Sequence, residues 1–475
     1  MSHTLVFDIG KTHARALVFD AALDCVHRVQ RASEVLGGCP YPHLDAGRLW
    51  AWMLEAMREA AGRLRIARLN VSAHGATAAL VDPALGDDGL VLPILDYECA
   101  EPARDRGYEE LRPDFGETLS PALPAGLNLG RQLWWQQRRF PRSFARAGAI
   151  LSYPQYWTWR LSGVAVGECT SLGCHTDLWN PGVRAFSSLV RSQAWESRFP
   201  AIASAFVPIG PLRDEVARAT GLGGDCAVYA GVHDSNAGFA RHLRAARGRP
   251  FVLVSTGTWV VCMAAGGSVR RLDPVRDMLA NVDVNGDPVP CARFMGGREY
   301  ARICELTGSD PAQPVTLAQI QATVAAGVLA LPDFSGGSGP CPGRAGRITG
   351  RSEHGVALAS LYLALMIELE LELLDAPGEV LIEGPFALNP LLCSLLATLC
   401  AQPVYVAGST DATAIGAAML CDWECEREPV VRERCEPCAL QGLADYRAQW
   451  REQLAADRAA LGVEAPNRHI DGIRP

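Results

Sequence analysis

The sequence predicts an α/β protein built of two related lobes, on three observations. Residues 4–20 form two short apolar runs around a small turn at 10–12, the pattern of a β-hairpin. Residues 250–264 repeat this pattern about half a chain later, around a Gly-Thr turn, as an internal structural repeat would. Strand and helix patterns follow each hairpin, and 475 residues exceed what one hydrophobic core usually holds.

The first half of the chain continues the predicted lobe. Asp45 is expected to cap a helix that runs to about Arg63, with its apolar residues on one face. The polar segment 168–180 is expected to line a site. The other expected elements are a third antiparallel strand at Cys25–Val35, a strand at Leu69–Ala73 that ends at His74, a helix at Pro154–Gly163, and a strand at Cys226–Ala230.

The second half offers a second set of strands and helices. Strand, glycine turn and helix N-terminus at 380–390 form a cradle suited to an adenosine moiety, although an ordinary α/β crossover has the same pattern. The elements expected here are a loop at Gly336–Pro340, a helix at Glu353–Asp375, strands at Glu379–Glu383 and Val404–Val406, a helix at Pro390–Ala401, and a small-residue helix after Asp411.

The turn of the first hairpin suits a phosphate group. Gly10 allows close backbone approach, Thr12 and the backbone N–H groups can donate hydrogen bonds, and Asp8 can hold Mg²⁺. Lys11 is the only lysine in the chain, and every other basic residue apart from histidine is arginine. This indicates a requirement for a compact ammonium group. The alternative is an ordinary hairpin with a solvent-facing turn.

Composition excludes several classes of function. A formal charge of −8 and a pI near 5.7 argue against nucleic-acid or anionic-membrane partners. The start of the chain lacks the pattern of a signal peptide, and the apolar run 356–374 contains three glutamates. We therefore expect a cytoplasmic protein whose sixteen cysteines are thiols. Four of them, Cys421, Cys425, Cys435 and Cys438, have spacings that could also bind zinc.

Seven segments, in this order, resemble the FGGY carbohydrate kinases of the actin-like ATPase superfamily over nearly the whole chain. They are 8–15 (DIGKTHAR), 72–75 (SAHG), 153–163 (YPQYWTWRLSG), 231–235 (GVHDS), 255–259 (STGTW), 383–389 (EGPFALN) and 411–416 (DATAIG). The resemblance implies two RNase-H-like lobes with the active site in the cleft between them. It places an N-terminal sugar-binding lobe at 1–240, a C-terminal nucleotide-binding lobe at 241–440, and a terminal helix and tail at 441–475.

The same resemblance implies roles for individual residues. Asp234, which by pattern alone is a helix-capping aspartate, would be the catalytic base. Sugar contacts would come from His74, Asp96, His233 and Ser235. Nucleotide contacts would come from Asp8, which also holds the metal, and from Gly10, Lys11, Thr12, Arg15, Thr256, Gly257, Thr258, Gly384 and Asn389. Two positions depart from the family pattern: Lys11 replaces a small or hydroxyl residue, and Pro385-Phe386 interrupts a run of glycines.

The expected activity is ATP- and Mg²⁺-dependent phosphorylation of a primary hydroxyl of a ketose. The His233-Asp234-Ser235 triplet resembles that of the deoxyketose kinases more than that of the xylulose branch, which implies a substrate such as L-rhamnulose or L-fuculose, with Trp157 or Trp159 beside the C6 methyl group. The alternatives are a pentulose (xylulose or ribulose) kinase, a non-catalytic sugar or nucleotide sensor, and an actin-like assembly ATPase. The expected partners are the sugar and the nucleotide, and the assembly expected beyond the monomer is a homodimer.

Overall fold

The computed structural model describes residues 2–86, 88–341, 343–408, 411–425 and 432–460. They form two compact units that are discontinuous in sequence. The first contains residues up to Ala245, the segment Ala280–Pro288 and the segment that starts at Asp411; the second contains the rest. The continuous ranges 1–240, 241–440 and 441–475 stay a prediction, and the tail beyond 460 lies outside the described residues.

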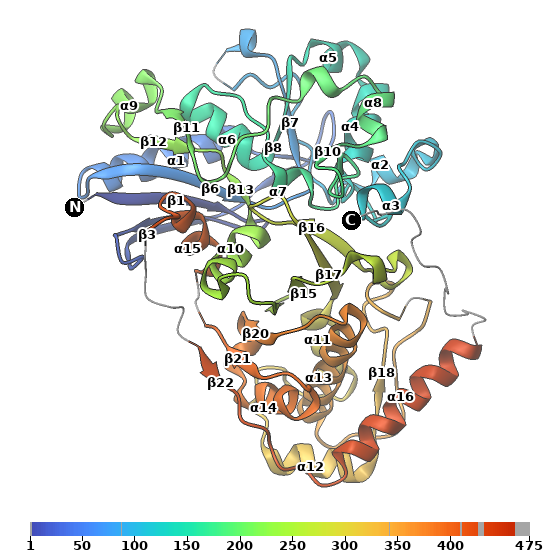
Figure 1. The fold of residues 1–475 in the computed structure, drawn as a ribbon. Helices are drawn as coiled ribbons and strands as arrows, with labels where there is room; N and C mark the ends of the chain where they lie inside the picture. Colours follow the sequence, from blue (N-terminus) through green and yellow to red (C-terminus); the bar gives the residue numbers. More distant parts are fainter. Residues whose placement is uncertain (1, 87, 342, 409–410, 426–431, 461–475) are drawn as a thin grey trace. The chain divides into compact units, whose positions relative to one another are not determined.

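A mixed sheet forms the centre of the first unit (Figure 1). Strands β1, β2 and β3 make the predicted antiparallel meander, and β6 adds to β1 in parallel. The sheet order is β11 (Pro208–Pro211), β12 (Ala227–Tyr229), β6 (Ile66–Ala73), β1 (His3–Ile9), β2 (His13–Phe19) and β3 (Cys25–Ala32), with β13 (Val232–His233) also paired to β6.

Helices cover both faces of this sheet because the side chains of β1 alternate between the faces. Helices α1 and α6 pack on one face with the odd-numbered residues of β1, and α10 and α15 pack on the other with Val6. Asp45 caps α1 as predicted, accepting a hydrogen bond from the backbone N–H of Arg48. The bounds of these helices are α1 Ala46–Ala61, α6 Tyr153–Ser162, α10 Asp234–Ala246 and α15 Ala412–Leu420.

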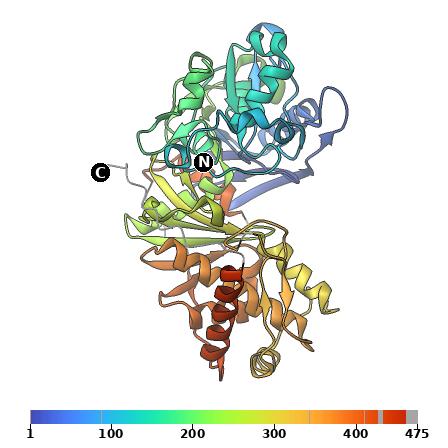
Figure 2. The ribbon, with the colours of Figure 1, turned by 90° about the vertical axis from the view of Figure 1, so that its right-hand side faces the viewer.

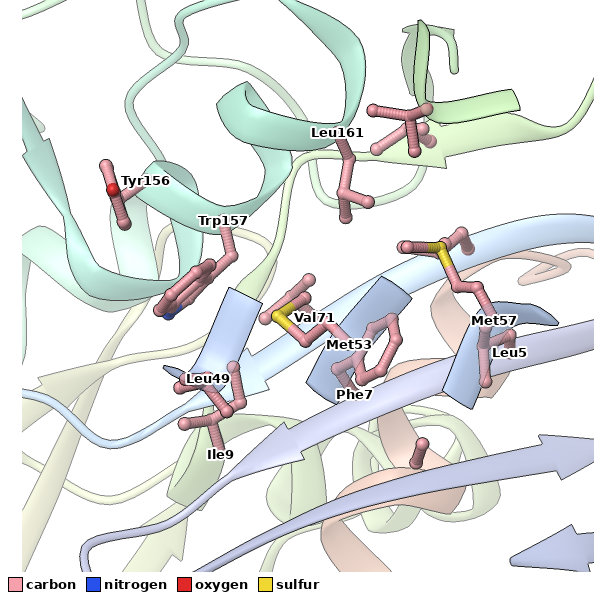
Figure 3. Close-up of a cluster of buried hydrophobic side chains, with 14 of the residues drawn as sticks. Leu5, Phe7, Ile9, Leu49, Met53, Met57, Val71, Tyr156, Trp157 and Leu161 are labelled. Atoms are coloured by element: carbon pink, nitrogen blue, oxygen red, sulfur yellow. The ribbon is translucent and has the colours of Figure 1, made fainter. Parts of the chain in front are cut away.

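The core under α1 and α6 contains Trp157, which is 0% exposed (Figure 3). Its ring stacks on Trp50 at 6.4 Å and meets Tyr156 edge-on at 4.9 Å. Trp159 is also buried, against Tyr156 and the guanidinium of Arg213. The expectation that these two tryptophans face a sugar methyl group is therefore corrected: both are core residues.

The rest of the first unit is rich in loops. Among its elements, β7 and β8 form a two-stranded antiparallel sheet from segments far apart in sequence, and α4 carries a largely buried polar face. The segment 168–180, expected to line a site, is mostly buried, and its Thr170 and Cys174 contact His233. Glu168 caps α7 through the N–H groups of Thr170 and Ser171. The bounds are β7 Ala78–Val81, β8 Ala149–Ser152, α4 Leu129–Arg139 and α7 Cys169–Leu172.

The sheet of the second unit repeats the topology of the first. β14 pairs antiparallel with β15 and β15 with β17, whereas β20 adds to β14 and β21 to β20 in parallel. This matches β1, β2, β3, β6 and β12, so the predicted structural repeat is confirmed. The strand order is β16 (Leu279–Val282), β17 (Pro288–Phe294), β15 (Val260–Ala265), β14 (Phe251–Thr256), β20 (Glu379–Glu383), β21 (Val404–Val406) and β22 (Glu433–Arg434).

Helix α13 is the central helix of the second unit and is almost entirely buried. Helix α16, red in Figure 2, lies beside β18 and is anchored where Trp450 Nε1 donates to the carbonyl of Ala330 at 2.8 Å. The remaining bounds are α11 Gly296–Leu306, α12 Leu317–Ala326, β18 Ala330–Leu331, β19 Arg347–Ile348, α13 Gly355–Leu374, η6 Pro385–Leu388, α14 Pro390–Leu399 and α16 Leu443–Ala460.

Two features are absent from the described residues. No helix there combines the length and the apolar run that crossing a bilayer requires. No cluster of three or more histidine, cysteine, aspartate or glutamate side chains is arranged to hold a metal ion there. The zinc alternative for the four C-terminal cysteines, all of which lie in the described residues, therefore has no support.

Candidate active site

The first hairpin places Asp8 and Arg15 opposite each other, since these two residues are paired across β1 and β2. Asp8 is 5% exposed, and its Oδ2 accepts hydrogen bonds from Nε of Arg15 at 3.1 Å and from Nη2. Arg15 Nη1 also donates to Oδ1 of Asp411 at 3.2 Å. Burial raises the pKa of Asp8 to about 6, although the guanidinium of Arg15 opposes that rise.

The environment of Asp8 is suited to a bound cation. Both bonds from Arg15 go to Oδ2, so Oδ1 is not used by this pair. A buried carboxylate with a raised pKa gains from a bound divalent ion, and oxygen is the ligand that Mg²⁺ prefers. Arg15, expected at the phosphates, holds Asp8 in place in this structure.

The turn of the hairpin has the expected close geometry. Gly10 N–H donates to the carbonyl of His13 at 2.9 Å, and a Cβ on Gly10 would lie 3.2 Å from that oxygen. Thr12 is exposed, and its hydroxyl lies 3.1 Å from Nδ1 of His13. Gly10 and Thr12 therefore lie in a close turn that faces solvent, as both a phosphate site and the alternative of an ordinary hairpin require.

Asp234 lies at the same sheet edge as His74. Strands β6 and β13 run parallel and pair His233 with Ala73, so the residues that follow each strand come together. Oδ1 of Asp234 accepts from the backbone N–H of Ser235 at 2.6 Å and from its hydroxyl at 3.3 Å. Burial raises the pKa of Asp234, and His74 and these hydrogen bonds oppose the rise. Asp234 is therefore a stronger base than an ordinary aspartate.

His233 has a different environment from the sugar contact expected of it. The ring is buried, with Nδ1 2.9 Å from Nδ2 of Asn236 and Nε2 3.2 Å from both Sγ of Cys174 and Oδ1 of Asp234. Burial lowers the pKa of His233 to about 4, so the ring is neutral at pH 7. Because the amide of Asn236 donates to Nδ1, the ring proton is assigned to Nε2, which faces Asp234.

The ring of His74, expected at the sugar, contacts two aromatic rings of the first unit. Its ring is 5.3 Å from that of Tyr97 and 4.8 Å from that of Tyr153. Its Nδ1 lies 3.0 Å from the carbonyl of Gly75. Burial lowers the pKa of His74, which keeps the imidazole neutral.

Lys11 contacts the loop that carries Asp96. Its Nζ pairs with Oδ1 of Asp96, lies 3.3 Å from Oε2 of Glu98, and sits 4.6 Å from the centre of the Tyr97 ring. The structure thus directs Lys11 toward residues expected at the sugar, although the sequence analysis expected it at the phosphates.

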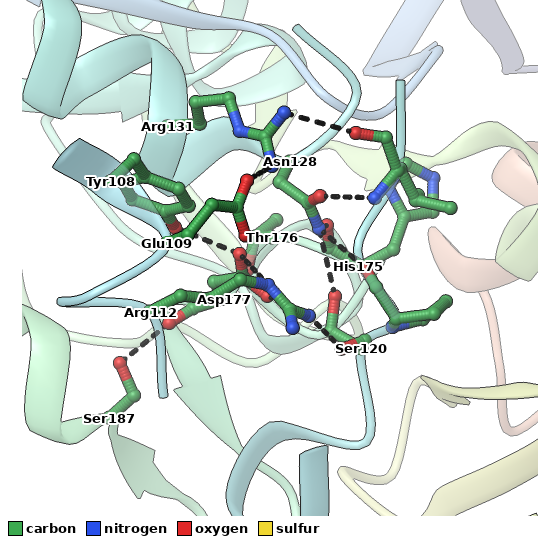
Figure 4. A network of polar contacts seen from close by, with 12 residues as sticks. Tyr108, Glu109, Arg112, Ser120, Asn128, Arg131, His175, Thr176, Asp177 and Ser187 are labelled. Atoms are coloured by element: carbon green, nitrogen blue, oxygen red, sulfur yellow. Dashed lines mark hydrogen bonds and ion pairs between the residues drawn. The ribbon is translucent and has the colours of Figure 1, made fainter. Parts of the chain in front are cut away.

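A buried polar network supports the loops behind Tyr97 (Figure 4). Asp177 accepts from Nε of Arg112 at 3.1 Å and from the hydroxyl of Tyr108 at 2.8 Å. Asn128 Oδ1 accepts from the backbone N–H of Leu123 at 2.8 Å. Between Leu123 and Asn128 in sequence, Gly126 N–H donates to the carbonyl of Tyr97 at 2.8 Å. The network thereby fixes one wall beside His74.

In the second unit, helix α11 begins against the turn of the second hairpin. Gly297 N–H donates to the carbonyl of Thr258 at 3.2 Å. A Cβ on Gly297 would overlap the carbonyl oxygen of Gly257 and lie 3.0 Å from its carbon. No role was predicted for this glycine pair, Gly296-Gly297, although two glycines between a strand and a helix are a signal in the sequence.

Thr256 connects this hairpin to the glycine turn after β20. Its hydroxyl donates to the carbonyl of Glu383 and accepts from the N–H of Phe386 at 3.2 Å. Gly384 has φ +89° and leaves no room for a Cβ beside Thr256. The hydroxyl of Thr256, expected at a phosphate, therefore organises the glycine turn after β20.

The other two features of that loop have structural roles. Oδ1 of Asn389 caps α14 by accepting from the N–H of Leu392 at 3.2 Å. Pro385 stands in the first turn of η6, where a missing N–H costs nothing. The departure from a run of glycines is thus compatible with an ordered loop.

Comparison with known proteins agrees with this geometry. The model of the FGGY family of carbohydrate kinases, N-terminal domain, matches residues 3–240, and that of carbohydrate kinase FGGY, C-terminal domain, matches 248–429. An L-fuculokinase from Salmonella typhi is 28% identical over 276 residues, which span 56% of this chain and 57% of that protein.

Solved structures extend the likeness to the whole chain. A carbohydrate kinase from Novosphingobium aromaticivorans is 36% identical, with a TM-score of 0.86 over 96% of this chain and 100% of that one. A xylulose kinase from Rhodospirillum rubrum shares the fold at 18% identity, with a TM-score of 0.78 over 97% of this chain and 99% of that one. The chain therefore belongs to the FGGY family of carbohydrate kinases.

Proposed function

We propose that this protein transfers the γ-phosphoryl group of ATP to a primary hydroxyl of a ketose, with Asp234 as general base. The observation that carries the proposal is the position of Asp234 at the ends of β6 and β13, with a raised pKa and with His74 beside it. Such a carboxylate can accept a proton from a bound hydroxyl group near neutral pH.

The chain's own residues account for the chemical step. The sugar oxygen forms a bond to phosphorus as the bond to the leaving ADP oxygen breaks, and the hydroxyl proton passes to Asp234. His74 and Asp96 orient the sugar, and the hairpin turns at 10–12 and 257–258 supply N–H donors for the phosphates. Asp8 would hold Mg²⁺, which when bound neutralises phosphate charge. Phosphoryl transfer relies on this positioning more than on covalent help.

Within this class we propose a deoxyketose such as L-rhamnulose or L-fuculose. The proposal rests on the His233-Asp234-Ser235 triplet and on the similarity to the L-fuculokinase. With Trp157 and Trp159 in the core, no wall for a C6 methyl group is assigned. A methyl group contributes about 1–3 kcal/mol, whereas a mismatched hydroxyl can cost about 10⁴-fold in kcat/KM. Hydroxyl stereochemistry is therefore expected to dominate.

A substrate panel tests this proposal. L-rhamnulose, L-fuculose, L-ribulose, D-ribulose, D-xylulose, L-xylulose and glycerol are each assayed with Mg-ATP for kcat/KM. We expect L-rhamnulose or L-fuculose to give the highest value. D-xylulose or D-ribulose as the best substrate would replace the deoxyketose with a pentulose, and no activity on any of them would favour a sensor.

A further inference from the structure

We propose that Lys11 determines sugar specificity: its ammonium group holds the carboxylate of Asp96 in a subsite that selects a neutral polyol over a sugar acid. This inference rests on the proposed function and replaces the phosphate role that the sequence suggested. It concerns a residue at which the chain departs from its family's pattern.

Lys11 contacts one short loop of the first unit, residues 96–98. Its ammonium group engages three successive residues, through the carboxylates of Asp96 and Glu98 and the face of the Tyr97 ring. The side chain of Lys11 is 21% exposed and that of Asp96 is 9% exposed, so water weakens their ion pair less than it would on an open surface. A compact ammonium with three donors can serve all of these contacts together.

The loop that Lys11 holds is part of the sugar side. Tyr97 packs edge-on against His74, and the carbonyl of Tyr97 accepts a hydrogen bond from Gly126. The ring of Tyr97 therefore contacts both the ammonium group of Lys11 and the ring of His74. These contacts place Lys11 and Asp96 beside His74, the residue after β6, whose neighbour strand β13 leads to Asp234.

The bonds within this cluster leave Asp96 able to act on a sugar. Lys11 Nζ and the backbone N–H of Glu98 both donate to Oδ1 of Asp96. Oδ2 is not used by either bond and can accept a hydrogen bond from a sugar hydroxyl. Lys11 thus acts as a positioning residue for Asp96.

The charge of the cluster indicates the class of sugar. Lys11 is paired with the carboxylates of Asp96 and Glu98, and the carboxylate of Asp234 follows the strand beside His74. The guanidinium of Arg31, in the same pocket as Lys11 and His74, is paired with Glu34. The two buried histidines of the site add no positive charge at pH 7, because burial lowers their pKa values. A carboxylate on the ligand would meet like charge. The cluster therefore favours uncharged ketoses and polyols over aldonates.

The test separates a sugar role from a phosphate role by steady-state kinetics. Lys11→Met, Asp96→Asn and the double variant are compared with wild type, with the best ketose of the panel and ATP varied in turn. Arg63→Met is the control for the loss of one basic side chain, since Arg63 is 64% exposed and pairs with Glu59 at the surface of the first unit. Lys11→Arg tests whether charge alone suffices, and thermal unfolding confirms that each variant is folded.

We expect Lys11→Met to raise the KM for the ketose about 10- to 100-fold, the scale of one hydrogen bond to a charged group. The KM for ATP should change less than about twofold. The double variant should be no worse than the poorer single variant, because both changes break one unit. Lys11→Arg should recover only part of the loss, Arg63→Met should match wild type, and wild type should prefer the ketose to D-gluconate.

Three results would overturn the inference while leaving the kinase intact: a raised KM for ATP with an unchanged KM for the ketose, additive single effects in the double variant, or D-gluconate as the better substrate. Absence of sugar-dependent ATP turnover in wild type would instead overturn the proposed function itself.

Discussion

The contact between Gly297 and Gly257 makes a quantitative prediction about the second hairpin. In Gly297→Ala, the new Cβ would overlap the backbone oxygen of Gly257 and lie 3.2 Å from Cα of Thr258. The neighbours are backbone atoms, so no side-chain rotation can relieve the overlap. Restoring ordinary contact requires helix α11 and the turn to separate by about 1 Å, and a displacement of that size lowers rates about 100-fold.

The assay measures both catalysis and stability. We expect kcat/KM for ATP to fall about 100-fold and the free energy of unfolding to fall by about 1–3 kcal/mol, the usual cost of overpacking. Sugar binding measured without nucleotide should be unchanged, because the sugar residues belong to the other unit. Gly350→Ala is the matched control, as its Cβ would meet only Val328 Cγ2 at 3.7 Å. A Gly297→Ala enzyme with wild-type kcat/KM for ATP would refute the claim that α11 fixes this turn.

Three further predictions follow from buried polar groups. Asn236→Ala should free the neutral ring of His233 to turn away from Asp234. The value of kcat should fall several-fold and the acidic pKa in the pH profile of kcat should shift, while the KM for ATP stays constant. An unchanged pH profile of kcat would contradict this. The Mg²⁺ concentration for half-maximal activity should rise about tenfold for each unit that the pH is lowered below 6, because a proton then competes with Mg²⁺ for Asp8. A Mg²⁺ requirement that stays constant between pH 5 and 6 would count against Asp8 as the ligand. Glu370 is buried with neither carboxylate oxygen hydrogen-bonded in the described residues, and burial raises its pKa well above the ordinary value. Because the folded state then holds the proton more tightly than the unfolded state, the stability that the protonated form contributes is lost as pH rises above about 4.5. Glu370→Gln should therefore flatten the fall in melting temperature from pH 5 to 8, and parallel curves for the variant and wild type would contradict this.

Much of the fold could be predicted because its determinants are local in sequence. Apolar runs around a small turn predict both hairpins. Asp45 predicts the start of α1, because its side chain caps the first turn of that helix. The repeated order of antiparallel and parallel strands follows from the same local pattern occurring twice. By contrast, the segment 280–288 and the segment from Asp411 belong to the first unit. No local pattern records which distant segment a strand or helix will join.

The site was predictable to the extent that its residues follow strands. Asp8, His74 and Asp234 each come at or after the end of a strand, and the sheet brings those ends together. The partners of His233 were not predictable, because Cys174 lies 59 residues away in sequence. The direction of the Lys11 side chain likewise depends on a loop 85 residues further along the chain.

The most direct test of the account is the turnover of Asp234→Asn with the best ketose of the panel. The amide cannot accept the hydroxyl proton, yet it keeps the size and most hydrogen bonds of the carboxylate. We predict that sugar-dependent ATP consumption falls about 100-fold or more, the scale of a lost general base, while the affinities for ATP and for the ketose stay within a few-fold of wild type. An Asp234→Asn enzyme that retains most of its turnover would show that Asp234 only begins helix α10, and the central claim would be wrong.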